Sequence, residues 1–323
     1  MKKNYIIGAV VLACAVVAAI GGSVYYYENG KKLSSGVVQK QGKNKVKADK
    51  EISKDSNTEV HKVEEVQKPN TLSKTIMEID KENYDTYQWW NASESQLLEK
   101  LSSEAKEYKD AQIQSIVDNA KEIPSYLIRL AVMHPESIPY VAGYPTRKVN
   151  QPINIKPYYT PGKIPLFEQW DKQWGYDQYG EGPLATDGCG PTSLAMVAVG
   201  LTGNTSINPK VVADYSETHG GYVPGEGTSW SLMSDLSPHF GVKGTRIPEN
   251  QVIDELKAGH PVIAAMGPGI FTLTGHFMVL TGVTPDGKIT INDPDSIKYS
   301  NETWNFNQIA TSARAYWSFT KIN

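Results

Sequence analysis

The sequence has only two cysteines in 323 residues, Cys14 and Cys189, and they are far apart in the chain. We therefore do not expect the disulfide framework that stabilises many small secreted domains. The six histidines are scattered, and no two cysteines have the spacing of metal ligands, so neither a metal centre nor another cofactor is predicted. Internal repeats and a glycine-rich phosphate-binding loop are also missing from the sequence.

Neither sign of charge is in large excess, because 32 Lys and Arg residues face 35 Asp and Glu residues. The positive charge is concentrated near the N-terminus, where residues 31–75 carry eleven lysines, six acidic residues and no aromatic residue. Such a segment buries too little apolar surface to offset chain entropy, so we predict a disordered linker over residues 28–75. The remaining chain is acidic, which argues against nucleic acid as a partner.

One long apolar run precedes the linker. Residues 5–27 contain no charged side chain, and a helix of that length can cross a bilayer core of about 30 Å. We interpret residues 1–27 as an uncleaved transmembrane signal anchor, with a cleavable signal peptide as the alternative. Lysines flank the run on both sides, so the positive-inside rule gives conflicting orientations. The short leading segment favours a single-pass protein of the cell membrane whose folded part is extracytoplasmic.

Cys189 lies in the hexapeptide GCGPTS at 188–193, between a glycine turn and a predicted helix. Pro191 suits the first position of that helix, and apolar residues follow it. A sulfur at a helix N-terminus lies near backbone N–H groups and the positive end of the helix dipole, which favour a nucleophilic thiolate. The alternative is a small buried residue without chemistry.

Two predicted strands bring a base and an acid together. His276 begins the apolar run HFMVLTGV, and Asp293 follows the run ITIN after the turn PDGK. Antiparallel pairing of two arms of about eight residues places His276 near Asp293, where a carboxylate can fix the imidazole tautomer. The alternatives are a core histidine bonded to a backbone carbonyl and an ordinary Asp-Pro turn.

These motifs, GCGPTSLAM, GHFMVL and NDP, resemble those of papain-fold cysteine peptidases related to the double-glycine leader peptidases of bacteriocin exporters, the peptidase C39-like family. The resemblance covers roughly residues 160–320. It implies an α+β fold in which a catalytic helix packs on an antiparallel sheet. It also implies that Cys189 attacks, His276 activates it and Asp293 orients His276. A glutamine upstream completes the family's oxyanion hole, which favours Gln169, with Gln173 as the second choice.

Residues 76–150 are predicted to be helical, and residues 151–323 to form the peptidase-like domain. Ser93 and Gln96 have the spacing of a capping box, and apolar residues follow at helical intervals. We predict an accessory layer that supports the peptidase-like domain, with an inhibitory prosegment as the alternative.

The chain is thus predicted to be a membrane-anchored bacterial cysteine peptidase whose partner is a peptide or protein substrate. The resemblance implies glycine-rich scissile sites, but the sequence has no transporter helices, so leader processing is not assumed. Two alternatives stay open: a non-catalytic surface binding module on the same fold, and a papain-fold amidase acting on cell-wall peptide. Such amidases commonly have a second histidine in place of Asp293. The sequence does not specify an oligomeric state.

Overall fold

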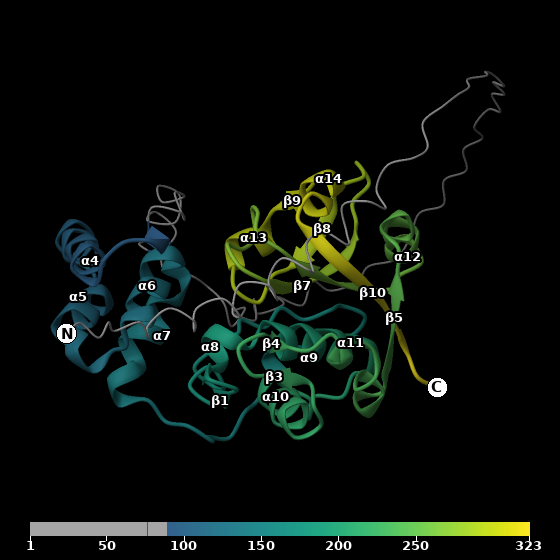
Figure 1. The fold of residues 1–323 in the computed structure, drawn as a ribbon, viewed down its shortest axis with the longest axis horizontal. Coiled ribbons are helices and arrows are strands. Elements are labelled where there is room, and N and C mark those ends of the chain that lie inside the picture. The colour runs from purple at the N-terminus through teal and green to yellow at the C-terminus, as the bar shows by residue number, and fades with distance from the viewer. Residues whose placement is uncertain (1–75, 77–88) are drawn as a thin grey trace, which may run out of the picture. The chain divides into compact units, whose positions relative to one another are not determined.

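The computed structural model describes residue 76 and residues 89–323 (Figure 1). The predicted signal anchor at 1–27 and the predicted linker at 28–75 lie outside the described residues. Among the residues that are described, no helix has the length and apolar character needed to cross a membrane. We refer to residues 89–146 as the helical region and to residues 151–323 as the sheet region.

Side-chain caps set the starts of the first two helices of the helical region. Ser93 accepts a hydrogen bond from the Gln96 backbone N–H, and the Gln96 side chain accepts one from the Ser93 N–H at 2.8 Å, which confirms the predicted capping box. Asp110 accepts from two N–H groups of the next helix. These caps satisfy donors that have no acceptor within the helix. The helices are α4 (Glu94–Tyr108), α5 (Ala111–Asp118), α6 (Ser125–Met133) and α7 (Ile138–Gly143).

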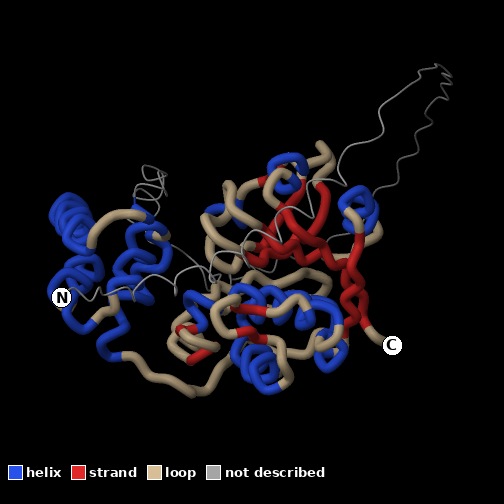
Figure 2. The backbone as a smooth tube through the Cα atoms, viewed as in Figure 1, coloured by secondary structure: helices blue, strands red, loops and turns tan. Residues whose placement is uncertain are grey.

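A six-stranded antiparallel sheet, with the order β5-β10-β6-β7-β8-β9, forms the centre of the sheet region (Figure 2). Its pairing sets Met266 of β6 opposite His276, the first residue of β7. Helices together with an antiparallel sheet confirm the predicted α+β class. The strands are β5 (Val242–Ile247), β6 (Val262–Met266), β7 (His276–Val283), β8 (Ile289–Asn292), β9 (Thr303–Trp304) and β10 (Ala313–Lys321).

Both faces of the sheet are buried, and alternate residues of each strand serve the two faces. In β6, Ile263 and Ala265 pack in one core, while Val262, Ala264 and Met266 pack in the other. This explains why the strand is apolar throughout instead of alternating with polar residues. Figure 1 shows α9 (Cys189–Thr202) and α10 (Pro209–Thr218) on one side of the sheet. Helices α12 (Val252–Lys257) and α14 (Phe306–Ala310) contribute to the core on the other side.

Helix α9 is the central helix of the first core. Every residue from 190 to 199 is buried, so this stretch is small and apolar on all sides. The helix begins at Cys189, two residues before the start predicted from Pro191, because a proline in the first turn removes only an N–H that has no intrahelical acceptor. It ends at Gly203, whose φ of 73° is the left-handed conformation in which helices commonly terminate.

Several elements differ from the sequence-based expectations. Strand β8 has four residues instead of about eight, because the chain turns directly after Asn292 into α13 (Ile297–Asn301). A short helix, α11 (Ser231–Ser234), precedes strand β5. Strand β5, strand β9 and helices α10, α13 and α14 were not anticipated, because their short segments show little periodicity.

The helical region packs against the sheet region through apolar side chains and two reciprocal tyrosine hydrogen bonds. The hydroxyl of Tyr140 donates to the carbonyl of Gly175 at 3.0 Å, and the hydroxyl of Tyr176 donates to the carbonyl of Tyr140 at 2.7 Å. The two rings stack with centroids 4.5 Å apart. A Cβ on Gly143 would lie 2.6 Å from the Tyr176 hydroxyl oxygen, so this close approach requires glycine.

Replacement of Tyr176 by Phe should lower the free energy of unfolding by about 1–2 kcal/mol, because the buried Tyr140 carbonyl loses its donor. Urea unfolding measures this change. Tyr159→Phe serves as the control, since the Tyr159 hydroxyl makes no hydrogen bond to the described residues, and it should shift stability by less than about 0.5 kcal/mol. Equal effects of the two substitutions would contradict the role of this contact.

Candidate active site

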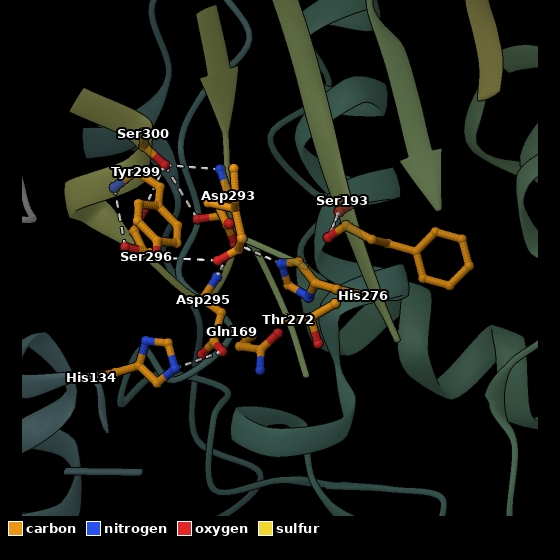
Figure 3. Close-up of polar contacts among 12 residues, drawn as sticks. His134, Gln169, Ser193, Thr272, His276, Asp293, Asp295, Ser296, Tyr299 and Ser300 are labelled. Atoms are coloured by element: carbon orange, nitrogen blue, oxygen red, sulfur yellow. Dashed lines mark hydrogen bonds and ion pairs between the residues drawn. The ribbon is translucent and has the colours of Figure 1, made fainter. Parts of the chain in front are cut away.

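A histidine and an aspartate from the ends of neighbouring strands meet in a buried pair. His276 Nε2 lies 2.7 Å from Asp293 Oδ1, and the side chains are 6% and 1% exposed (Figure 3). A carboxylate only accepts hydrogen bonds, so Nε2 is the donor, and Nδ1 is the ring nitrogen left for another group. The sequence-based expectation that pairing brings these two residues together thus agrees with the geometry.

The turn after β8 holds the Asp293 carboxylate in place. Asp293 Oδ1 also accepts from the Asp295 backbone N–H at 2.9 Å, and the Asp293 N–H donates to Ser300 Oγ at 2.8 Å (Figure 3). The helical region supports the same turn, because the buried Glu136 carboxylate accepts from the Lys298 N–H at 2.6 Å. The first two bonds hold Asp293 itself, and the third holds the helix that follows it. The Asp295 N–H and His276 Nε2 bind the same carboxylate oxygen, Oδ1.

Cys189 is half-buried at the first position of α9, near the His276 side chain. A hydrogen bond also links helix α9 to strand β7, because Ser193 Oγ donates to the Phe277 carbonyl at 3.1 Å. Because Ser193 follows Cys189 by one helical turn and Phe277 follows His276 directly, this bond keeps sulfur and imidazole in register.

Gln169 lies near the same residues, whereas Gln173 does not. Gln169 is 3% exposed, its Nε2 donates to the Ala185 carbonyl at 2.9 Å, and its backbone N–H donates to the Pro294 carbonyl at 2.7 Å. Its Oε1 is buried without a hydrogen-bond partner among the described residues. Gln173 instead donates to Tyr158 and accepts from the Asn154 N–H. The geometry therefore favours Gln169 of the two candidates.

A cavity of about 490 Å³ gives access to these side chains. Cys189, His276 and Gln169 all contribute to its lining, and Asp293 lies behind His276. The loop before β7 lines it from Gly269 to Gly275. Within residue 76 and residues 89–323, no group of three or more His, Cys, Asp or Glu side chains is arranged to hold a metal ion.

Sequence reasoning missed the contribution of the helical region to this cavity. Six lining residues come from it: Trp90, Tyr126, Arg129, Leu130, Met133 and His134. A faint signal exists in α6, where Tyr126, Leu130 and Met133 repeat at helical spacing on a second apolar face. Nothing local in the sequence identifies what that face meets.

The electrostatics of the site favour a protonated His276. Burial alone would lower the pKa of this imidazole, but the Asp293 carboxylate and the hydrogen bond with Cys189 outweigh it. The pKa of His276 is consequently raised well above its ordinary value of about 6.5. An imidazolium beside a sulfur stabilises the thiolate, which is the nucleophilic form of cysteine.

Two further carboxyl groups are buried close to Asp293. Glu168 is 1% exposed, and neither of its carboxyl oxygens has a hydrogen-bond partner among the described residues. Burial, and then the nearby carboxylates of Glu136, Asp293 and Asp295, raise the pKa of Glu168 well above its ordinary range. Burial likewise raises the pKa of Asp295, although His134 Nε2, 3.4 Å from its Oδ2, opposes this shift.

Comparison with known proteins finds a family match over most of the sheet region. Residues 162–322 match the sequence profile of the Peptidase_C39 like family, which confirms the resemblance drawn from the three motifs. A similar solved structure is the peptidase domain of Streptococcus ComA, a bi-functional ABC transporter involved in a quorum sensing pathway. It is 17% identical, with a TM-score of 0.35 over 46% of this chain and 99% of that chain. No curated protein matches the chain.

Replacement of Glu168 by Gln should stabilise the protein at pH 8 by about 1–3 kcal/mol. Because the pKa of Glu168 is raised in the folded protein, its contribution to stability is fully present below the unfolded pKa of about 4.3. That contribution is lost as the pH rises through the folded pKa. The charged form of Glu168 is therefore disfavoured in the folded protein at pH 8. Urea unfolding between pH 4 and pH 8 measures the difference between variant and wild type.

The exposed Glu107 of α4 provides the matched control, and Glu107→Gln should leave the pH dependence of unfolding unchanged. If the Glu168→Gln variant is as stable as the wild type at both pH 4 and pH 8, the buried Glu168 carboxyl group does not destabilise the protein at high pH, and the prediction is wrong.

Proposed function

From the match of residues 162–322 to the Peptidase_C39 like family, we propose that this protein is a cysteine peptidase in which Cys189, His276, Asp293 and Gln169 carry out the reaction. The observation that supports the proposal is that Cys189, His276 and Gln169 line one cavity, while His276 Nε2 binds the carboxylate of Asp293. A thiol, a base and an orienting acid close together are the groups that nucleophilic cleavage of a peptide bond needs.

In the first step, the Cys189 thiolate attacks the carbonyl carbon of the scissile peptide, forming a C–S bond while the carbonyl electrons move onto oxygen. The His276 imidazolium then gives its Nδ1 proton to the departing amine, and the C–N bond breaks. A thioester remains. His276 then takes a proton from a water molecule, whose oxygen attacks the thioester carbon. The C–S bond breaks, the acid leaves, and the imidazolium and the thiolate are restored. Asp293 holds the ring orientation through both steps.

The negative charge on the carbonyl oxygen needs donors, and two are close to Cys189. The first-turn N–H groups of α9 have no intrahelical acceptor, and the N–H of Cys189 is one of them. Gln169 Nε2 carries two hydrogens, of which one binds the Ala185 carbonyl. The other is the donor we assign to the oxyanion.

We also propose that the protein acts at the cell membrane. The uncharged run at 5–27 and the lysine-rich segment at 28–75 support an anchor and a spacer, with the sheet region on the outer side. Glycine-rich peptide sites are the substrates that the family resemblance implies.

Iodoacetamide should alkylate Cys189 of the full-length protein rapidly at pH 6, where an ordinary thiol with a pKa of about 8.5 is almost entirely protonated. His276→Ala removes the cation beside the sulfur and should slow alkylation at pH 6 by about tenfold or more. Mass spectrometry of the peptide that contains Cys189 follows the rate.

His239→Ala is the matched control, because His239 stacks on Tyr215 and does not line the cavity. Alkylation at the same rate in all three proteins, with the pH curve of an ordinary thiol, would contradict the peptidase mechanism and leave a non-catalytic binding module.

Once a cleaved peptide is in hand, Gln169→Ala should lower kcat by about 10²–10³-fold and change KM little, because an oxyanion donor acts in the transition state. Gln173→Ala is the matched control and should retain kcat, since Gln173 is bound to Tyr158 and Asn154. A larger loss in the Gln173 variant would transfer the oxyanion role to that residue.

A further inference from the structure

The cavity that contains Cys189 is bounded by two parts of the chain, and only one of them belongs to the family match. The matched residues supply Gln169, Cys189, His276 and the loop before β7. The opposite boundary comes from the helical region, which precedes residue 162. Any selectivity provided by that boundary therefore comes from residues outside the family match.

Helix α6 has two apolar faces with different surroundings. Leu127, Ile128, Ala131 and Val132 are buried in the core of the helical region. Tyr126, Leu130 and Met133 repeat at intervals of four and three residues, so they lie along one face, and that face lines the cavity. Tyr126 remains 47% exposed, which leaves apolar surface that the fold itself does not use.

Trp90 extends this face and is held there by a cation from the same helix. Arg129 Nη1 donates to the carbonyls of Trp89, Trp90 and Ala92 at 3.1, 2.7 and 3.1 Å. The guanidinium thus anchors the backbone that carries Trp90, whose side chain is 44% exposed. The arrangement fixes an aromatic residue beside Leu130 and Met133 before any ligand binds, which lowers the entropy cost of binding.

The loop before β7 adds apolar surface to the cavity. Ile270 is 47% exposed, and Phe271 packs edge-on against Tyr299 with ring centroids 5.6 Å apart. The charges in the lining are of both signs, since three carboxyl groups and three basic side chains contribute to it: Glu181, Asp187, Asp295, Arg129, His134 and His276. An occupant that suits the apolar part of the lining has a bulky apolar side chain.

We infer that Trp90, Tyr126, Leu130 and Met133 form a specificity subsite that takes a bulky apolar side chain, such as Leu, Met or Phe, of a peptide bound near Cys189. The inference rests on the proposed peptidase function. It assigns the helical region a role in selecting peptides, in addition to its packing against the sheet region.

The test uses the full-length Cys189→Ala protein in detergent, because this variant binds peptides without cleaving them. It is incubated with a random octapeptide library, and retained peptides are sequenced by mass spectrometry. We expect Leu, Met and Phe to be enriched about tenfold over Asp and Glu at one position, in keeping with burial of one large apolar side chain.

A charge substitution in the same background makes the test specific. Leu130→Lys should remove the apolar preference and favour Asp or Glu at that position, a gain that a misfolded protein does not produce. Val211→Lys is the matched control, because Val211 is 41% exposed on α10 and does not line the cavity, and its profile should equal that of the parent. The same profile for the Leu130 variant and its parent, or no enrichment in the parent, overturns the inference.

This outcome is separate from that of the alkylation experiment, which uses the natural Cys189. Rapid alkylation without apolar enrichment retains the peptidase and removes the subsite. Apolar enrichment without rapid alkylation retains the subsite and identifies a peptide-binding module instead of a peptidase.

Discussion

The hydrogen bond between His276 and Asp293 places a charged pair in a largely buried position, and a buried charge is stable only when it has hydrogen-bond partners. Much of the surrounding structure meets this requirement. The Asp295 N–H supplies a second donor to the Asp293 carboxylate, and Ser300 binds the Asp293 backbone. Glu136 then fixes the following helix from outside the sheet region. The position of the base therefore depends on residues from both regions.

The same constraint connects the thiol to the pair. Carboxyl groups accumulate around His276: Asp293 binds it, and Asp295, Glu136 and Glu168 are close to Asp293. The Asp293 carboxylate favours the cationic form of the imidazole and raises the pKa of His276. Cys189 is the first residue of α9, and the Ser193 to Phe277 bond holds this helix in register with β7.

The sequence was informative wherever a local pattern had a single structural meaning. The run at 276–283 became β7, the capping box at Ser93 started α4, and the meeting of His276 with Asp293 followed from strand pairing. Local patterns did not predict contacts between residues distant in sequence. Glu136 meets Lys298 across 162 positions, and the second face of α6 has the same periodicity whether it meets a core, a cavity or water. Strand β5 was missed because its polar residues resemble a loop.

The apolar core of the helical region has a consequence for how the chain is made. Its helices are synthesised before the sheet region, yet the core also requires Trp170, Tyr176, Ala185 and Ile297. Ile297 lies in α13, close to the C-terminus, and the tyrosine pair needs Tyr176. On the ribosome, the early helices therefore present an incomplete apolar surface until almost the whole chain has emerged. That surface needs protection during synthesis, although it is covered in the folded protein.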